Sequence, residues 1–421
     1  MSEAASEPAQ LVVQKFGGSS LATPERISRV AERVAATAAS GVSVCVVVSA
    51  MGDTTDDLLD LAAQVSETKH ARETDMLLAA GEQISIALLT MALLDRGLPA
   101  VSLTGPQAGI LTDSSHGNAR IIGMRADRVA AAIERGEIPI VAGFQGLSQD
   151  LDVTTLGRGG SDTTAVALAA ALGAGVCEIY TDVVGVFTAD PRLVPNARKL
   201  ERLSYHEMLD LAACGARVLM ARSVEYARRT GVPLHVRSSF TEEEGTWIVE
   251  EGEAMEHAIV SGIAHDTSEA KVTLSGVPDQ PGIAASVFRP LAEAGINVDM
   301  IVQNVSEGGH TDISFTVAET DLERAEEIVE TVAKRISAAG VAAERGIAKV
   351  SLIGAGMKSD PGVAAGMFEA LAEAGINIQI ISTSSIRISC VIDANAAEEA
   401  VQAIHERFKL HLVGAAPAAG A

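Results

Sequence analysis

Aromatic residues are scarce in this chain. They make up 3% of its 421 residues, with one Trp, three Tyr and eight Phe. A stacking platform for single-stranded nucleic acid is therefore not expected. Basic residues are also in the minority, with 32 Lys and Arg against 55 Asp and Glu and a formal net charge of −23. Phosphate backbones and anionic membranes repel such a surface, so no nucleic-acid or membrane partner is predicted, although a local basic pocket stays compatible with it.

Cysteines and export signals are few as well. The four cysteines, Cys45, Cys177, Cys214 and Cys390, form no CxxC pair and lie among apolar neighbours, so they are predicted to be reduced and buried. The first ten residues lack the basic and apolar regions of a signal peptide, and no apolar run approaches the roughly 18 residues of a membrane span. We expect a cytoplasmic protein.

What the chain has in quantity is aliphatic residues and glycine. Hydrophobic residues make up 48%, and there are 38 Gly. Up to about residue 250, short β-branched runs such as 11–15, 42–49, 138–142 and 176–181 alternate with helical patterns such as 24–40 and 162–172. This alternation predicts an α/β domain over 1–250, a mostly parallel sheet sandwiched by helices, with ligands beyond the carboxyl ends of its strands.

An internal repeat follows an acidic stretch at 241–253 that is typical of a linker. Residues 281–301 align without gaps on 361–381, with 13 of 21 positions identical and an offset of 80 residues. Each copy predicts strand, Pro-Gly turn, helix, Ala-Gly-Ile-Asn turn and strand, with a further strand at 312–317 and helix at 322–336 in the first copy. The pattern indicates two ferredoxin-like βαββαβ modules, over 265–340 and 341–415.

Two Gly-rich loops are candidate anion sites. The segment 15–20 (KFGGSS) directly follows the first strand, so Lys15 and the amides of Gly17 and Gly18 suit phosphate, unless this is only a tight turn. It lacks the spacing of a Walker A loop. The segment 154–165 (TTLGRGGSDTTA) opens a helix and carries Arg158, which can grip a carboxylate, while Ser161 and Asp162 also suit plain helix capping.

Three further segments remain ambiguous on residues alone. Residues 49–56 (SAMGDTTD) suit either a polar substrate or an ordinary loop, and Glu82, beside Gly81, either holds an ammonium group or faces solvent. Residues 180–192 (YTDVVGVFTADPR) suit a purine and its phosphates, with a structural hairpin the better interpretation if taken alone. His116 has no Cys or His at metal spacing and is predicted to be a loop residue rather than a ligand.

Together these segments, in this order, resemble the aspartate kinases of the amino-acid kinase superfamily, most of all the lysine- and threonine-sensitive actinobacterial kind. The motifs that carry the resemblance are QKFGGSS, VVSAMGDTTDDLL, AAGEQIS, VTTLGRGGSDTTA and YTDVVGVFTADPR, and it covers about residues 10 to 412. It implies the amino-acid kinase fold followed by a pair of ACT domains. It also implies phosphorylation of the side-chain carboxylate of L-aspartate by ATP with Mg²⁺, the first step of lysine, threonine and methionine biosynthesis.

The resemblance also implies site residues. Lys15 and Asp162 would be catalytic, with Asp162 orienting Lys15. ATP would be bound by Lys15, Phe16, Gly17, Gly18, Ser49, Tyr180, Thr181, Asp182, Val186, Phe187, Thr188, Ala189, Asp190, Pro191, Arg192 and Arg217. Aspartate would be bound by Asp53, Thr54, Thr55, Glu82, Arg158, Gly159, Gly160 and Ser161. No residue is expected to ligate a metal directly. Phe187 stands where relatives commonly have Tyr, and Arg217 where many have Lys.

The charge pattern agrees with this chemistry. An aspartate side chain has a reference pKa of about 3.9, so it is already ionised at neutral pH and needs no general base. Catalysis then consists of bringing two anions together and neutralising them. Arg158 would take the α-carboxylate of the substrate and Glu82 its α-ammonium group.

The repeat resembles paired ACT domains, which bind amino acids. Lysine, threonine or both would bind as end-product inhibitors at Asp279, Gln280, Pro281, Gly282, Ile283, Ala284, Ala285, Asn297, Val298, Asp299 and Gln303, with Pro361, Gly362, Asn377 and Ile378 in the second copy. The resemblance further implies a homo-oligomer, or an assembly with a shorter in-frame regulatory subunit that starts at Met255.

Other functions compete with this one. A different kinase of the superfamily would act on glutamate, acetylglutamate or carbamate, but the pairing of Glu82 with Arg158 and the ACT pair favour aspartate. A non-catalytic amino-acid sensor would have no need of Lys15 and two anion loops. A dehydrogenase fusion is disfavoured because no GxGxxG unit follows the second module.

Overall fold

A computed structural model describes residues 11–68, 70–250, 260–305, 308–360 and 362–412. The described residues of the ranges 1–186, 199–213 and 217–255 form one compact unit, and those of 187–198, 214–216 and 256–421 form a second. The segment 187–198 therefore belongs by its packing to the second unit, although its chain neighbours belong to the first.

The first unit is built on an eight-stranded sheet of order β10-β12-β11-β9-β1-β2-β6-β3, in which only the β11–β12 pair is antiparallel. A second sheet has the order β5-β4-β7-β8. The strands of the two sheets are β1 Leu11–Phe16, β2 Ser43–Val48, β3 Ala100–Leu103, β4 Ile110–Thr112, β5 Ile121–Met124, β6 Ile138–Ala142, β7 Gln145–Leu147, β8 Val153–Thr155, β9 Val176–Thr181, β10 Arg202–Ser204, β11 Leu234–Ser238 and β12 Thr246–Val249. The central strands β1 and β2 are buried along almost their whole length, as expected of parallel strands with helices on both faces.

The helices of the first unit pack on the eight-stranded sheet or on one another. They are α1 Pro24–Ala39, α2 Thr54–Val65, α3 Ala71–Leu94, α4 Asp127–Glu134, α5 Gly160–Leu172, α6 Tyr205–Ala213 and α7 Ala221–Thr230. Helix α1 begins at a favourable signal, with Pro24 at its first position and the Thr23 hydroxyl accepting from the Arg26 amide. Helices α1 and α3 share a core with β1, β2 and β6. Helix α5 also packs on β1 and β2, and its small, largely buried residues allow a close approach to the sheet.

Helix α3 is unusually apolar. Among the described residues, it is the one helix that would be long and apolar enough to cross a membrane, and half of its most apolar 18-residue window is buried inside the molecule. The sequence pattern predicts that no apolar run approaches the length of a membrane span. By its length and composition, α3 shows that this prediction was wrong. Its buried face, which includes Ile86, Leu89 and Leu93, packs in the core beside the sheet.

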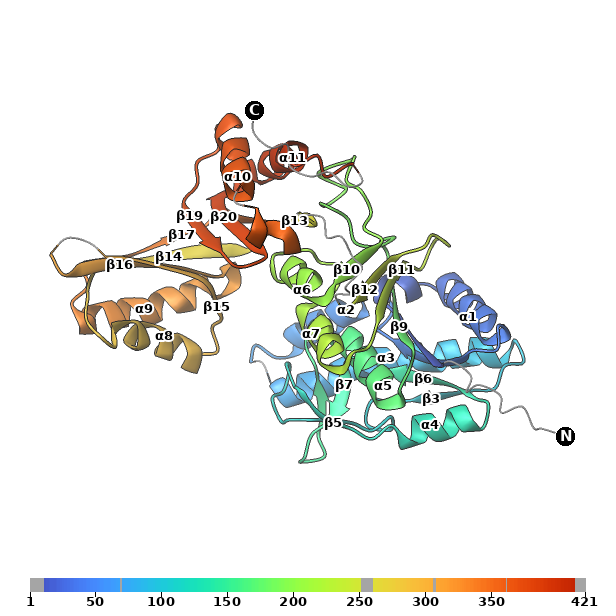
Figure 1. Cartoon of the computed structure of the whole chain (residues 1–421). Helices are drawn as coiled ribbons and strands as arrows, with labels where there is room; N and C mark the ends of the chain where they lie inside the picture. The colour runs from blue at the N-terminus through green and yellow to red at the C-terminus, as the bar shows by residue number, and fades with distance from the viewer. Residues whose placement is uncertain (1–10, 69, 251–259, 306–307, 361, 413–421) are drawn as a thin grey trace. The chain divides into compact units, whose positions relative to one another are not determined.

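The second unit contains two four-stranded antiparallel sheets, of order β15-β16-β14-β17 and β13-β18-β20-β19. Their elements are β13 Gly262–Asp266, β14 Glu269–Pro278, α8 Ile283–Glu293, β15 Val298–Val305, β16 His310–Ala318, α9 Leu322–Ile336, β17 Gly340–Glu344, β18 Ile347–Ile353, α10 Gly362–Glu373, β19 Ile380–Thr383, β20 Arg387–Asp393 and α11 Ala397–Arg407. In Figure 1, α8 and α9 lie side by side against one face of the β14–β17 sheet, with which they share a core. Helices α10 and α11 do the same for the other sheet.

Strand β13 has a register that the repeat did not predict. It precedes the first module in sequence, yet it pairs with β18 of the second, from Gly262 opposite Ile353 to Asp266 opposite Lys349. The last strand before the second module, β17, pairs instead with β14 of the first. The second sheet thus takes strands from both sides of the first module. The domain bounds 1–250, 265–340 and 341–415 stay a prediction.

The predicted fold class is confirmed: a mostly parallel α/β domain precedes two ferredoxin-like modules. Predicted strands 138–142 and 176–181 and predicted helix 322–336 match β6, β9 and α9 residue for residue. All four cysteines are free and buried, as predicted.

Candidate active site

Loops at the carboxyl ends of neighbouring strands meet in the first unit. The Gly17 amide donates to the Tyr180 carbonyl (3.2 Å), so the end of β1 is tied to that of β9. The Ser49 amide donates to the Phe16 carbonyl (3.1 Å) and the Gly143 amide to the Val48 carbonyl (2.9 Å), which extends the series to β2 and β6. The loops after four adjacent strands are therefore held in one place, as the parallel topology predicts.

Lys15 and Asp162 meet there. The Lys15 ammonium, near the end of β1, lies 2.5 Å from Oδ1 of Asp162 in the first turn of α5. Both side chains are largely buried, Lys15 at 9% and Asp162 at 7% exposure. The structure therefore brings the two predicted catalytic residues together and fixes the ammonium group at the Gly-rich turn.

Gly18 lets two of the loops touch. A Cβ atom at this position would lie 2.9 Å from the Ala50 carbonyl oxygen and 3.0 Å from that of Gly52. Both neighbours are backbone atoms and cannot move aside cheaply, and the Gly52 amide also donates to the Gly18 carbonyl (3.0 Å). Glycine is required here by close approach of two backbones.

Glu82 is buried on α3 with half of its carboxylate unsatisfied. It is 3% exposed; Oε1 accepts from the Ala50 amide (2.9 Å), while Oε2 has no partner among the described residues. Burial raises the pKa of Glu82 from 4.5 to about 7, and the Ala50 hydrogen bond only partly opposes this. A buried carboxylate oxygen without a donor fits a cationic ligand group.

Arg158 lies in the loop between β8 and α5. It is exposed, and no described residue forms an ion pair or hydrogen bond with its guanidinium. Gly159 at the N-cap of α5 has φ +72°, and a Cβ there would lie 2.0 Å from Cγ of Met220. Ser161, 6% exposed in the first turn, packs against Gly143. The loop therefore presents an uncompensated cation from a tightly specified backbone.

The other predicted aspartate residues lie at the start of α2. Asp53 occupies the N-cap position without making a side-chain cap, and the Thr54 hydroxyl donates to the Met51 carbonyl (2.6 Å). Asp53 is exposed, and Thr54 and Thr55 are half-buried, so all three are open to solvent beside the Ser49–Gly52 loop.

The predicted nucleotide residues divide into three groups. The Phe16 and Tyr180 side chains stack with centroids 4.7 Å apart in the core, at 0% and 1% exposure, so any nucleotide contact of theirs must come from the backbone. Ser49, Thr181, Asp182, Val186 and Arg217 also belong to the first unit, with Asp182 and Arg217 exposed and Val186 buried.

Residues Phe187 to Arg192 form the third group and belong to the second unit. Ala189 is part of the core around α10 and α11, and the Thr188 hydroxyl hydrogen-bonds Nε2 of His405 (3.0 Å). The Asp190 carboxylate pairs with Arg192 (2.7 Å), and Pro191 lies between them in the chain. The Thr188 amide donates to the Arg198 carbonyl (2.9 Å), so the chain turns back between these two residues and not within the predicted hairpin of 180–192.

The predicted effector residues of the first copy lie around the first turn of α8 and before or in β15, and those of the second copy lie at α10 and between α10 and β19. Asp279, Gln280 and Pro281 are exposed after β14, and Gly282 caps α8 with φ 91°. Ile283, Ala284 and Ala285 form the first turn of α8; Asn297, Val298, Asp299 and Gln303 lie before or in β15; Gly362 begins α10, and Asn377 and Ile378 lie between α10 and β19. Pro361 and Met255 lie outside the described residues.

Three residues to which the sequence analysis gave no role in a site lie behind the Arg158 loop. Asp75 is fully buried and pairs with Nδ1 of His116 (2.7 Å), and Arg222 donates to the Leu156 and Ala119 carbonyls (2.8 and 2.6 Å). His116 is a loop residue, as predicted, but it has a carboxylate partner. The seven-residue spacing of Asp75 and Glu82, which puts both on one face of α3, was a signal available in the sequence.

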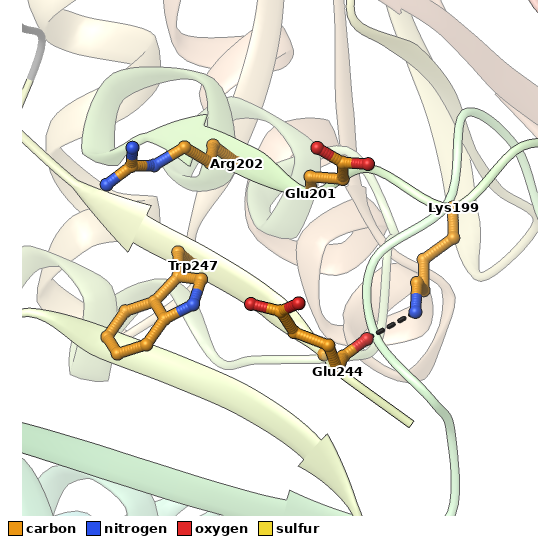
Figure 2. Close-up of a pocket in the computed structure, with 6 residues that line it drawn as sticks. Lys199, Glu201, Arg202, Glu244 and Trp247 are labelled. Atoms are coloured by element: carbon orange, nitrogen blue, oxygen red, sulfur yellow. Dashed lines mark hydrogen bonds between the residues drawn. The ribbon is translucent and has the colours of Figure 1, made fainter. Parts of the chain in front are cut away.

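A separate cavity of about 440 Å³ lies at the β10–β12 edge of the same unit. Figure 2 shows its charged lining beside the Trp247 indole, with the Lys199 ammonium bonded to the Glu244 carbonyl. Its lining residues are Lys199, Glu201, Arg202, Glu244, Gly245 and Trp247. None of the residues predicted for substrate or nucleotide lines this cavity.

Comparison with family models divides the chain in the same way. Residues 10–238 match the amino acid kinase family, and residues 272–336 and 350–408 each match an ACT domain. The chain is 60% identical to an aspartokinase of Mycolicibacterium smegmatis over 95% of its own length and 96% of the relative's. An aspartokinase of Corynebacterium glutamicum is 57% identical, again over 95% and 96% of the two chains.

Solved structures agree. The chain superposes on E. coli aspartokinase III in complex with aspartate and ADP with a TM-score of 0.81 and 26% identity, over 94% of this chain and 99% of that one. An R-state is named for that complex, and a T-state for the complex of the same enzyme with lysine and aspartate (TM-score 0.73, 27% identity, 94% and 99% coverage).

Proposed function

The chain belongs to the aspartokinases of the amino acid kinase family, and on that premise we propose that it transfers the γ-phosphoryl group of ATP to the side-chain carboxylate of L-aspartate. The products are 4-phospho-L-aspartate and ADP. The observation that carries the proposal is the charge arrangement around Lys15: the unpartnered Glu82 oxygen and the uncompensated Arg158 are counterparts of an α-ammonium and an α-carboxylate. The reaction would be the first step of lysine, threonine and methionine biosynthesis, in the cytoplasm.

The chain's own groups supply positioning and charge. Lys15, held by Asp162, neutralises negative charge on the transferring group, and the Gly18 amide approaches the same phosphates, whereas the Gly17 amide already donates to the Tyr180 carbonyl. Glu82 and Arg158, with Gly159, Gly160 and Ser161, orient aspartate so that its ionised side-chain carboxylate attacks without a base. Because the step joins two anions, removing the positive charge of Lys15 or Arg158 should reduce kcat. The fold should change little.

Mg²⁺ is expected to enter as its complex with ATP. It neutralises phosphate charge when bound. Among the described residues, no three His, Cys, Asp or Glu side chains gather as a metal-binding group.

An ADP-release assay over an acceptor panel tests the proposal. We expect turnover with L-aspartate and little with glutamate, acetylglutamate or carbamate, and loss of turnover in Lys15→Ala. Preference for another acceptor would assign the chain to a different specificity within the family. Aspartate binding without any ADP release would favour an amino-acid sensor.

We also propose feedback inhibition by lysine, threonine or both at the ACT modules. The lysine-bound T-state of the E. coli relative supports an amino-acid effector, and an effector inhibits if it binds a less active arrangement better. The test is kinase activity with each amino acid singly and together. Asp279→Asn should weaken inhibition, whereas Glu330→Gln, on the exposed face of α9, serves as the control. Unchanged activity and melting temperature with both amino acids would refute this regulation.

A homo-oligomer is proposed as the assembly, alone or with a shorter regulatory chain from Met255. Support comes from α3, where Ile84, Leu88 and Met91 are exposed at spacings of four and three residues and form an apolar stripe. Light scattering should give a mass above one chain, and Leu88→Lys should reduce it if this stripe is the interface. A single band with an antibody to the C-terminus would exclude the shorter chain.

A further inference from the structure

Asp75 is the best-satisfied buried carboxylate near the candidate active site. Its side chain is 0% exposed and accepts from the Thr155 hydroxyl (2.5 Å), from Nδ1 of His116 (2.7 Å) and from the Gly117 amide (3.0 and 3.1 Å). Asp75 lies on α3, and its partners come from the end of β8 and from the loop 113–120. The carboxylate therefore fastens a helix, a strand and a loop to each other at one buried point.

What Asp75 fastens is the base of the Arg158 loop. Thr155 is three residues before Arg158, and its carbonyl accepts from the Ala119 amide (2.9 Å). Arg222 bonds the Leu156 and Ala119 carbonyls with its two terminal nitrogens, so the strand end and the loop are joined a second time. Gly157 lies so close that a Cβ there would be 3.0 Å from Oδ1 of Asn118 and 3.1 Å from the Gly117 carbonyl oxygen. The loop 116–119 is thus packed directly beneath the Arg158 loop.

Asp75 and Glu82 lie on the same buried face of α3. Seven residues make about two helical turns, so their backbones are about 10 Å apart along the axis. Glu82 holds the Ser49–Gly52 loop through the Ala50 amide, and Asp75 holds the Arg158 loop through Thr155. One rigid helix therefore sets the separation between the carboxylate offered to an α-ammonium and the loop that carries Arg158.

We infer that Asp75 and His116 are positioning residues for aspartate: they hold the Arg158 loop at a fixed distance from Glu82 and so set the affinity for the α-carboxylate. Neither residue touches the substrate. The inference rests on the proposed function, in which Arg158 and Glu82 receive the two α-substituents. It predicts a loss confined to aspartate binding, because among the described residues no hydrogen bond or ion pair joins Asp75 to the Lys15 turn at the end of β1.

The test uses the full-length chain with four single variants and the double variant His116→Ala/Thr155→Val. His116→Ala removes the donor to Asp75, and His116→Asn places an amide N–H near the position of Nδ1. Thr155→Val removes the hydroxyl donor with little change of shape. His70→Ala is the matched control, because His70 is an exposed residue just before α3 whose side chain caps nothing. KM and kcat are measured for both substrates, with melting temperature, and aspartate affinity is measured separately by calorimetry with ADP present.

His116→Ala and Thr155→Val should each raise the KM for aspartate about tenfold, with the KM for ATP within about twofold of wild type. His116→Asn should recover most of the loss, and His70→Ala should behave as wild type. Because both donors act through one carboxylate, the double variant should lose less than the product of the single effects. Calorimetry should show the same weakening of aspartate binding.

Two results would overturn the inference. One is an unchanged KM for aspartate in His116→Ala and Thr155→Val when both are folded. The other is a fall in melting temperature together with equal rises in KM for aspartate and for ATP, which would indicate a merely structural role. Failure of the proposed function can be told apart from failure of this inference. If the proposed function fails, the wild-type chain releases no ADP with aspartate, while calorimetry still shows whether His116 affects aspartate binding. A wild-type chain that does not bind aspartate at all would refute both.

Discussion

The Lys15 ammonium lies 2.5 Å from the Asp162 carboxylate, although the two residues are 147 positions apart in the chain. The pairing joins the end of β1 to the first turn of α5, the two Gly-rich segments that the sequence singled out as anion sites. A lysine that is nearly buried and held by one carboxylate has a defined position from which to meet phosphate oxygens.

Lys15→Met should reduce kcat by about 10²- to 10³-fold, the range seen when one preorganised charge-stabilising group is removed. Asp162→Asn should cost less, because the ammonium group remains but loses its fixed position. Steady-state kinetics with aspartate and ATP measure both effects. Lys334→Met, an exposed lysine on α9, is the control and should leave kcat unchanged. Retained turnover in Lys15→Met would remove Lys15 from the mechanism.

Glu82 predicts a pH dependence of substrate affinity. Burial raises its pKa to about 7, and only the ionised form pairs with an α-ammonium group. The KM for aspartate should therefore rise as pH falls from 8 to 6. In Glu82→Gln it should be high and nearly independent of pH over this range. Glu73→Gln, an exposed position on the same helix, should retain the wild-type profile. A wild-type KM that does not change with pH would contradict this role.

The raised pKa of Glu82 also predicts that replacing this carboxylate by a neutral side chain stabilises the folded protein. The folded state holds the Glu82 proton up to about pH 7, whereas the unfolded chain releases it near 4.5. Glu82 thus favours the folded state below pH 4.5, and this contribution is lost as pH rises through 7. Glu82→Gln should raise the free energy of unfolding at pH 8 by up to about 3 kcal/mol and change it much less at pH 5. Denaturant unfolding at both pH values measures the difference, and an equal effect at both would contradict the assignment.

Lys349 predicts a stability effect in the second unit. It is 2% exposed on β18 and pairs with Glu269 of β14 and Asp299 of β15, so it joins the two modules. Although burial alone would lower the pKa of Lys349, the two carboxylates raise it above its usual value, so it stays charged. Lys349→Met leaves both carboxylates without a counterion and should cost about 3 to 5 kcal/mol. Faster amide hydrogen exchange in β14, β15 and β18 would show this loss of stability, and Lys334→Met serves as the control. Unchanged exchange would show that Lys349 and its two carboxylates contribute little to stability.

The cysteines should be unreactive while the protein is folded. All four are free and buried, and burial raises the pKa of Cys45 and Cys390 to about 12, so thiolate is scarce at pH 8. A thiol reagent should modify none of them in native protein and four per chain in denaturant. Rapid native labelling of any one would show that its surroundings open.

The sequence by itself predicted several of the strands and helices and singled out the loops that are candidates for the chemistry. β-branched runs and helical periodicity are local, and in a parallel sheet the loops after successive strands share an edge, so the Lys15 and Ser49 loops could be assigned to one region from their order alone. Arg158 follows β8 of the second sheet, so this rule does not place it. The repeat likewise specified two modules, because each copy carries its own turn and helix signals.

Only the tertiary structure decided which of these parts are partners. Periodicity tells which face of an element is buried but not what covers it, so β13 could not be assigned to β18, nor Asp75 to His116, 41 residues away. For the same reason Phe16 and Tyr180 proved to be core residues, and Ala189 packs with α10 and α11. Hydrogen bonds and buried contacts between distant residues depend on how the whole chain closes, and no local pattern records that.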